Sequence, residues 1–326
     1  MTQPSLAALR QAAAAFGIDA ARLTFVRDSV NVIYEFARAD QSYMLRLSAG
    51  ALRDRRLILG EMEWMAYLAA HGGRVSQPVR SARGALVETV EDGGETFHAA
   101  VFHKAPGVHP EGDLLDATLL HQMGQALGQM HRLGRGFRLA SPQVRRLHWY
   151  ELEVFDLPAR VPPGETLVRR ECERMLETLR ALPVDEDGYG LIHADPEPWN
   201  MLLYEGTLTF IDFDEACYCW YAFDLAVALL YAVLAAEPAD AHSFAHSAWR
   251  SLYAGYATEH PLAPVWLERM PLFLRLRMME DYAFHASQWQ GVDLEEREKG
   301  WLSYLRRPIV TGEFVLGMRP EDFTTS

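Results

Sequence analysis

The chain contains 326 residues, of which 49% are hydrophobic and 11% aromatic, so it can bury two folded units and is not an intrinsically disordered protein. Its formal net charge of −13 argues against a nucleic-acid partner and favours a small-molecule or cationic one. No apolar run reaches the roughly 18 residues that a membrane-spanning helix needs, and no signal-peptide pattern opens the chain. We therefore expect a cytoplasmic protein without membrane contact.

The first hundred residues predict a mixed helix and sheet unit. Residues 5–16 are rich in Ala and Leu and end at Gly17, which is typical of a short helix. Alternating or apolar β-rich runs at residues 23–26, 32–36, 43–47, 85–90 and 96–102 predict five antiparallel strands. A helix is expected over residues 53–70. The predicted domains are residues 1–103 and 104–326.

The helix expected over residues 53–70 carries an acid on its apolar face. Leu57, Glu61, Trp64 and Leu68 recur at spacings of three and four, so they share one side of the helix. A carboxylate buried among apolar side chains needs a cationic partner. The sequence therefore predicts an ion pair for Glu61.

The remainder of the chain predicts mostly helices, over residues 113–133, 149–157, 166–182, 221–230 and much of 239–307. Asp224 lies near the start of an apolar helix, where its burial is unfavourable unless it accepts several hydrogen bonds. A later helix carries Arg275, Arg277, Glu280, Asp281, His285 and Gln288. We take this helix as a candidate for substrate selection, with Glu280 or Asp281 suited to an amine.

Two motifs contain the candidate catalytic and metal-binding residues. The first includes His193, Asp195 and Asn200, in a loop that Pro196 and Pro198 make rigid. The second, Phe210-Ile211-Asp212-Phe213-Asp214, ends the hairpin that follows. ATP-dependent phosphoryl transfer requires this set: Asp195 accepts a hydroxyl proton, while oxygens of Asn200 and Asp212 hold Mg²⁺.

The ordered pair of motifs resembles the aminoglycoside phosphotransferase and choline kinase-like family, relatives of the eukaryotic protein kinases. Their catalytic loop reads His-x-Asp-x-x-x-x-Asn, and their metal-binding acid follows in Ile-Asp-Phe/Trp. The resemblance implies an α+β fold with two lobes, as in protein kinases. The small lobe would hold a five-stranded antiparallel sheet plus a helix, and the large lobe would be mainly helical. It also implies ATP and Mg²⁺ as cofactors, and that His193 packs beside and orients the loop.

The same resemblance implies the nucleotide-binding residues. Arg46 stands where the family places a phosphate-gripping lysine, and Glu61 would be its partner. Ser29 and Asn31 lie in a turn without glycine where the phosphate-covering loop belongs. Phe102 would close the back of the adenine pocket, with backbone groups of His103 and Ala105 at the adenine edge. Asp224 would accept N–H groups of the catalytic loop. The residues to which the resemblance gives a role are therefore Arg46, Glu61, Ser29, Asn31, Phe102, His103, Ala105 and Asp224.

The expected function is transfer of the γ-phosphoryl group of ATP to a hydroxyl of a small molecule. The acceptor is left open among aminoglycosides, homoserine, choline-like amines and sugars. One alternative is an inactive nucleotide-binding regulator, since Arg46 replaces lysine and the turn lacks glycine. Another is a phosphatase with Asp212 as nucleophile, because the second motif also resembles that of haloacid dehalogenase-like phosphatases. A protein kinase is disfavoured by Glu197, which stands where protein kinases carry a lysine.

Overall fold

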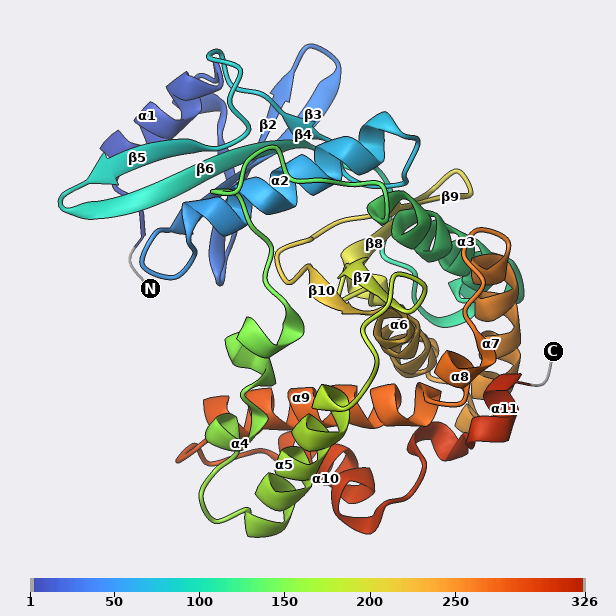
Figure 1. Cartoon of the computed structure of the whole chain (residues 1–326). Helices are drawn as coiled ribbons and strands as arrows, with labels where there is room; N and C mark the ends of the chain where they lie inside the picture. Colours follow the sequence, from blue (N-terminus) through green and yellow to red (C-terminus); the bar gives the residue numbers. More distant parts are fainter. Residues whose placement is uncertain (1–2, 325–326) are drawn as a thin grey trace. The chain divides into compact units, whose positions relative to one another are not determined.

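A computed structural model describes residues 3–324 and divides the chain into two compact units (Figure 1). The first unit contains the residues up to Val108, together with Gly136–Arg146 and Met201–Asp214. The second contains His109–Arg135, Leu147–Asn200 and the residues from Glu215 onward. The expected division between residues 103 and 104 is a single cut, whereas each unit here is built from several segments. Asp212 and Asp214 thereby fall in the first unit and the His193–Asn200 loop in the second.

The first unit is built on an antiparallel sheet, which has six strands within residues 3–324. The order is β1-β2-β3-β6-β4, and β5 pairs with β6 beside them. The strands are β1 (Thr24–Asp28), β2 (Asn31–Arg38), β3 (Gln41–Ala49), β4 (Pro78–Val79), β5 (Glu88–Asp92) and β6 (Glu95–His103). The expected five strands are all present. The expected number is wrong by one, because β4 has only two residues and is too short for a periodic pattern.

Two helices accompany this sheet. Helix α1 (Leu6–Ala15) begins after Ser5, whose side chain accepts a hydrogen bond from the N–H of Ala8, and packs against β5. Its buried residues join a core with apolar side chains of β2, β3, β5 and β6. Helix α2 (Arg55–Ala70) begins after Asp54, whose carboxylate accepts from the N–H of Arg56. Its buried face carries Glu61.

A hairpin late in the sequence completes the first unit. Strands β8 (Met201–Tyr204) and β9 (Thr207–Phe210) are joined by Glu205 and Gly206, both with positive φ angles of 47° and 74°. Such turns match the natural twist of two paired strands. Bridges from Val75 to Phe210 and from Val108 to Leu203 fix the hairpin to the unit. The hairpin therefore delivers Asp212 and Asp214 to the first unit.

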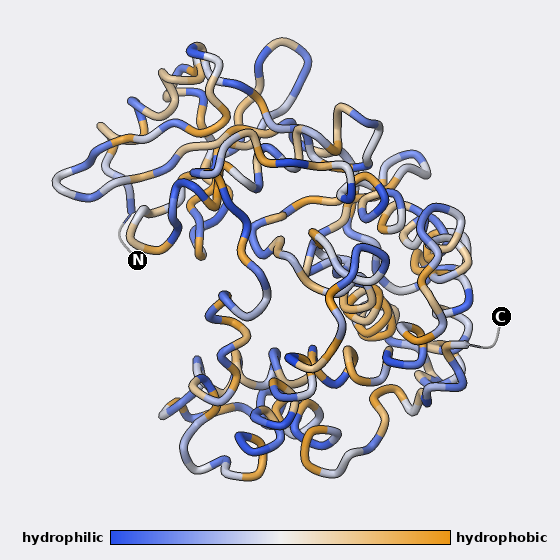
Figure 2. The backbone as a smooth tube through the Cα atoms, in the orientation of Figure 1, coloured by the Kyte–Doolittle hydropathy of each residue, from blue (hydrophilic) through white to orange (hydrophobic). Residues whose placement is uncertain are grey.

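The second unit is mainly helical. Its helices are α3 (Ala117–Gly134), α4 (Leu157–Arg160), α5 (Thr166–Arg180), α6 (Tyr221–Ala236), α7 (Ala241–Ala257), α8 (Pro264–Leu267), α9 (Met270–Gln288), α10 (Glu296–Thr311) and α11 (Pro320–Thr324). A two-stranded sheet of β7 (Tyr189–Ile192) and β10 (Cys217–Trp220) lies among them. Helix α6 is almost entirely buried and, apart from Asp224 in its first turn, mainly apolar. Most of its turns have the hydrophobic colours in Figure 2. Helices α3 and α7 pack so closely that a Cβ atom on Gly124 would lie 1.8 Å from the carbonyl oxygen of Leu252, which only glycine avoids.

The prediction of one helix over residues 149–157 is wrong. The segment forms two separate 3₁₀ turns, Trp149–Glu151 and Glu153–Phe155, before α4 begins at Leu157. Leu152 between them is extended, with φ −84° and ψ 131°, which ends the helical hydrogen bonding.

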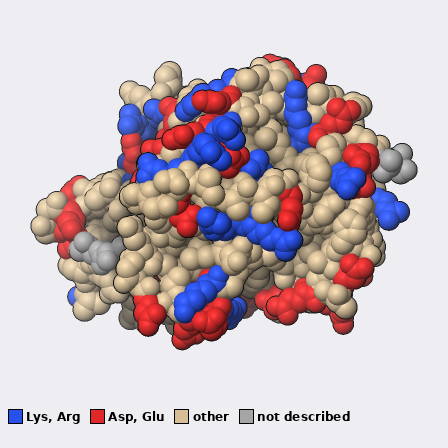
Figure 3. Space-filling model, turned by 90° about the horizontal axis from the view of Figure 1, so that it is seen from below, with Lys and Arg blue, Asp and Glu red and all other residues tan. Residues whose placement is uncertain are grey.

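Charged side chains of both signs are interspersed on the face of the molecule shown in Figure 3. Within residues 3–324, no helix is long and apolar enough to cross a membrane.

Candidate active site

The catalytic loop of the second unit begins where β7 ends at Ile192. Ala194 has a φ of 71°, which is unfavourable for a residue with a side chain. Its N–H and that of His193 donate to the carboxylate of Asp224, over 2.7 Å and 2.9 Å. The loop is therefore held in a strained conformation by a side chain of α6.

Asp224 is fully buried and accepts a third hydrogen bond, from Nε2 of His131 on α3 at 2.9 Å. The other ring nitrogen of His131 lies 2.8 Å from the hydroxyl of Tyr256. The predicted contact of Asp224 with the loop N–H groups is thus present. His131 was not predicted, because a single histidine on the apolar face of a helix carries no sequence signal for its partner.

Asp195 and Asn200 are connected directly. The side-chain nitrogen of Asn200 donates to a carboxylate oxygen of Asp195 at 2.8 Å and to the backbone carbonyl of Asp195 at 3.0 Å. These bonds turn the amide nitrogen toward Asp195, so the amide oxygen is the atom of Asn200 that is suited to a metal ion. The N–H of Asp195 donates to Nδ1 of His193 at 3.3 Å, which supports a loop-orienting role for His193.

Arg277 of α9 forms an ion pair with Asp195. One terminal nitrogen of its guanidinium lies 2.8 Å from Oδ1 of Asp195 and 3.2 Å from the hydroxyl of Tyr231. Its Nε lies 3.0 Å from Oδ1 of Asp281, and another terminal nitrogen lies 3.5 Å from Oε2 of Glu280. Burial acts to lower the pKa of Arg277, but the carboxylates and Tyr231 around it outweigh burial and raise that pKa. Arg277 therefore stays charged and fixes the position of Asp195.

A pocket of about 490 Å³ opens beside this ion pair. Its lining joins the catalytic loop, through Asp195 and Glu197, to α9, through Glu280 and Asp281. Carboxylates therefore dominate the polar groups that a bound molecule would meet.

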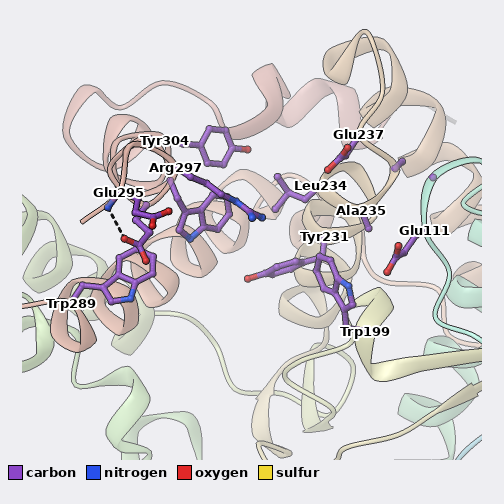
Figure 4. A pocket seen from close by; sticks show the side chains of 15 residues that line it. Glu111, Trp199, Tyr231, Leu234, Ala235, Glu237, Trp289, Glu295, Arg297 and Tyr304 are labelled. Atoms are coloured by element: carbon purple, nitrogen blue, oxygen red, sulfur yellow. Dashed lines mark hydrogen bonds between the residues drawn. The ribbon is translucent and has the colours of Figure 1, made fainter. Parts of the chain in front are cut away.

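A second, larger pocket of about 1090 Å³ shares Trp199 and Tyr231 with the first. Figure 4 shows Trp289 and Tyr304 across this pocket from Trp199 and Tyr231, with the side chain of Arg297 extending into it. Acidic side chains also line it: Glu111, Glu237, Glu295 and Glu298. Aromatic faces and carboxylates together suit ligands with flat or cationic groups.

In the first unit, the two acids of the second motif have different surroundings. Asp212 has a φ of 61°, and its partly exposed carboxylate lies 3.0 Å from a guanidinium nitrogen of Arg27. Asp214 is held by Arg53 at 2.7 Å and by the side-chain amide of Asn31 at 3.3 Å. Burial acts to raise the pKa of Asp214, but nearby arginines lower it overall. Asp214 therefore stabilises the unit, while Asp212 is the carboxylate that is more open to a metal ion.

Arg46 and Glu61 form the predicted ion pair. Both terminal nitrogens of Arg46 donate to the carboxylate of Glu61, at 2.8 Å and 2.7 Å, and the two side chains are 4% and 1% exposed. Burial raises the pKa of Glu61, and Arg46 opposes that shift. The Nε atom of Arg46 is buried without a hydrogen-bond partner among residues 3–324, so one donor remains for an anion.

Glu61→Ala is expected to lower the free energy of unfolding by about 3 kcal/mol, because it leaves the guanidinium of Arg46 buried without its carboxylate. Urea unfolding measures the loss. Glu63→Ala on the same helix is the control, because it removes one bond to the N–H of Ala140 and should lose only about 1 kcal/mol. Equal losses in the two variants would contradict a dominant Arg46–Glu61 pair.

The other predicted nucleotide-binding residues lie in the first unit. The ring of Phe102 is 5.2 Å from the guanidinium carbon of Arg46. His103 uses its N–H to donate to Gln77 and its carbonyl to accept from Ser76. Both backbone groups of His103 therefore already have partners within the unit.

Three more predicted nucleotide-binding residues differ in how accessible they are to a ligand: Ala105, Ser29 and Asn31. Ala105 is 9% exposed. Ser29 is exposed, and its N–H donates to the carbonyl of Asn31. The side chain of Asn31 is buried and accepts from Ser48 at 2.6 Å while donating to Asp214. Asn31 thus supports the hairpin acids, whereas Ser29 keeps an accessible hydroxyl.

Within residues 3–324, no cluster of three or more His, Cys, Asp or Glu side chains is arranged to hold a metal ion. The amide oxygen of Asn200 and the carboxylate of Asp212 are nevertheless hard oxygen donors. Mg²⁺ commonly takes one or two such protein ligands and completes its shell with phosphate oxygens and water. Taken singly, each of these two groups is therefore suited to an ion that arrives with a nucleotide.

A family model described as the phosphotransferase enzyme family matches residues 24–261. The chain belongs to this family. The predicted resemblance and fold class are confirmed, since solved aminoglycoside phosphotransferase and choline kinase structures share the fold.

This phosphotransferase is 34% identical over 308 residues to amicoumacin kinase of Bacillus subtilis (strain 168), a match that covers 93% of this chain and 91% of the relative. Homoserine kinase of Gluconobacter oxydans (strain 621H) is 27% identical over 283 residues, covering 82% and 86%. The solved amicoumacin kinase hAmiN, in complex with AMP-PNP, Ca²⁺ and Ami, has a TM-score of 0.89 and 30% identity, covering 94% and 93%. A solved aminopropanol kinase, at 22% identity and a TM-score of 0.75, shows the fold alone.

The phosphotransferase is an ATP-dependent kinase that acts on a small molecule, as predicted. Its cofactors are ATP and a divalent metal ion. Membership of this family excludes the phosphatase function that the second motif left open.

Proposed function

We propose that this phosphotransferase uses MgATP to phosphorylate a hydroxyl of amicoumacin or of a compound of similar size. The observation that supports the proposal is the pocket of about 490 Å³ that Asp195 lines, together with a pocket of about 1090 Å³ that shares Trp199 and Tyr231 with it. Pockets of about 300–1,000 Å³ are typical of drug-sized ligands. A single amino acid such as homoserine would fill only a small part of this space. The need for ATP favours the cytoplasm as its compartment.

The proposed roles of the catalytic loop follow from its contacts. Asp195 accepts the proton of the acceptor hydroxyl, and Arg277 and Asn200 hold its carboxylate in place. His193 orients the loop through its bond to the N–H of Asp195. Fixing the carboxylate before the acceptor binds reduces the entropic cost of the transfer step.

The proposed nucleotide and metal roles rest on the first unit and on Asn200. Asn200 of the second unit and Asp212 of the first are each proposed as an oxygen ligand of Mg²⁺, which would neutralise charge on the phosphates. Arg46 contacts the phosphates, held by Glu61 in a fixed orientation. The remaining proposed nucleotide contacts are Ser29, Phe102, Ala105 and the second lone pair of the His103 carbonyl, while Asn31 is proposed to act through its bond to Asp214.

The experiment that tests the proposal is a measurement of ADP release with a panel of hydroxyl acceptors: amicoumacin, L-homoserine, choline, an aminoglycoside and a sugar. Mass spectrometry of the product identifies the phosphorylated compound. Amicoumacin is expected to give a kcat/KM at least about 100-fold above that of L-homoserine, since binding in the extended pocket positions it. A preference for L-homoserine would make this a homoserine kinase. Binding of MgATP without turnover of any acceptor would favour the inactive regulator.

A further inference from the structure

The turn between β1 and β2 has few backbone donors to offer a phosphate. Residues 27–31 contain no glycine, and the N–H of Ser29 already donates to the carbonyl of Asn31 at 3.2 Å. The side chain of Asn31 is buried and bonded to Ser48 and Asp214. Glycine-rich loops bind phosphate through free backbone N–H groups that approach it closely. A side chain is therefore the group through which this turn can reach a phosphate.

A β-bulge in β1 directs the side chain of Arg27. Phe25 pairs with Tyr34 of β2, but Arg27 pairs with Ile33, so one residue of β1 is extra between the two pairs. Because successive side chains point to opposite faces, the bulge moves Arg27 from the face of Tyr34 to the face of Ile33. Ile33 in turn pairs with Arg46 of β3. Arg27 and Arg46 consequently lie on the same face of the sheet, two strands apart.

On this face Arg27 reaches the carboxylate that we propose for the metal ion. One terminal nitrogen of its guanidinium lies 3.0 Å from Oδ2 of Asp212, and the two side chains are 56% and 30% exposed. The adjacent carboxylate of Asp28 accepts from the side chain of Gln3 at 2.7 Å. The other nitrogens of the Arg27 guanidinium make no hydrogen bond among residues 3–324. Arg27 therefore has donors left for a second anion beside Asp212.

The spacing of the two arginines suits different phosphates of one nucleotide. Neighbouring strands lie about 4.8 Å apart, so the backbones of Arg27 and Arg46 are separated by about 10 Å. Arg46 stands where kinases carry the lysine that pairs with the α- and β-phosphates. This leaves the γ-phosphate, which the metal ion bridges, to Arg27. An exposed ion pair such as Arg27–Asp212 contributes little to stability, so its exchange for a phosphate contact has a low free-energy cost.

We propose that Arg27 binds the γ-phosphate of MgATP and releases the carboxylate of Asp212 to the metal ion. The proposal rests on the proposed function as a MgATP-dependent kinase with Asp212 as a metal ligand. In the transfer step the bond from the γ-phosphorus to the bridging oxygen of ADP breaks, the bond to the acceptor oxygen forms, and the acceptor proton passes to Asp195. Arg27 forms no covalent bond and gives up no proton. Its planar guanidinium compensates charge on the γ-phosphoryl oxygens.

The test that needs no turnover is calorimetric binding of AMP-PNP and of ADP, each with Mg²⁺, to the full chain. Arg27→Met is expected to weaken AMP-PNP binding about 30-fold and ADP binding less than about threefold, because only AMP-PNP carries the third phosphate. The control is Arg22→Met, which removes the same charge from an exposed arginine of the turn Ala20–Arg22 and should leave both affinities unchanged. An unchanged ratio of the two affinities in Arg27→Met would overturn the proposal. Equal weakening of both nucleotides leaves that ratio unchanged and has the same consequence.

Metal binding without nucleotide separates this role from a purely structural one. Electron paramagnetic resonance of Mn²⁺ added to the full chain gives the affinity of the metal alone. Arg27→Met is expected to bind Mn²⁺ about threefold or more tightly than the wild type, because a cation that competes for Asp212 is gone. An arginine that merely held Asp212 in place would give the opposite sign. Unchanged or weaker Mn²⁺ binding in Arg27→Met would therefore contradict the release of Asp212.

Kinetics with the acceptor that the panel identifies measure the effect on transfer. Arg27→Met is expected to lower kcat about 100-fold, because charge on the γ-phosphoryl oxygens loses a donor in the transition state. Arg27→Lys keeps the charge without the planar fork and should lose only about tenfold. A kcat for Arg27→Met within threefold of the wild-type value would count against the proposal. Failure of every acceptor would count against the proposed function instead, while the ratio of AMP-PNP to ADP affinity would still decide the role of Arg27.

Discussion

Asp195→Asn is expected to lower kcat about 10³-fold, because the amide cannot accept the proton of the acceptor hydroxyl. The fold should be unaffected, since an asparagine keeps the size of the side chain. The substitution also removes one of the three carboxylates that face Arg277, which relieves repulsion with Glu280 and Asp281. The free energy of unfolding is therefore expected to stay the same or to rise slightly. Steady-state ADP release and urea unfolding measure the two quantities.

The control for Asp195→Asn is Asp187→Asn, which makes the same chemical change on a side chain that is 79% exposed. Asp187 pairs with Arg135 on the surface, and such pairs contribute little to stability. Its kcat should equal that of the wild type. A kcat for Asp195→Asn within tenfold of the wild-type value would show that Asp195 is not the general base.

Asp224→Ala is expected to lower the free energy of unfolding by about 4 kcal/mol and to lower kcat in the same variant. The alanine leaves three buried donors without an acceptor: the N–H groups of His193 and Ala194 and Nε2 of His131. Ala194 has a φ of 71° that these bonds support, so the loop should relax and displace Asp195. Urea unfolding and ADP release check both losses.

Asp224→Asn tests the same contact without a cavity. It keeps one acceptor oxygen, so an intermediate loss of about 2 kcal/mol is expected. Asp187→Ala on the surface should lose less than about 0.5 kcal/mol. A fall in kcat for Asp224→Ala with no loss of stability would contradict the structural role and would make Asp224 part of the chemistry.

Much of the site could be predicted from the sequence because its signals are local. The catalytic loop and its second acid are recognised by spacing along the chain, between two short strands. Glu61 was predicted to need a cation from helical periodicity alone, and the resemblance supplied Arg46 as that cation. Asp224 was predicted to need several hydrogen bonds because an acid in an apolar helix must be compensated, and the resemblance supplied the loop N–H groups as the donors.

What the sequence by itself determined is therefore most of the helices and strands, the chemistry of the two motifs and the presence of buried acids that require partners. Only the tertiary structure decided which side chains supply those partners: His131 for Asp224, and Arg277 for Asp195. It also decided that Arg27, redirected by the bulge in β1, faces Asp212. The physical reason is that helical and strand periodicities act between near neighbours in the chain, whereas the distance between a charge and its partner depends on how separate helices pack.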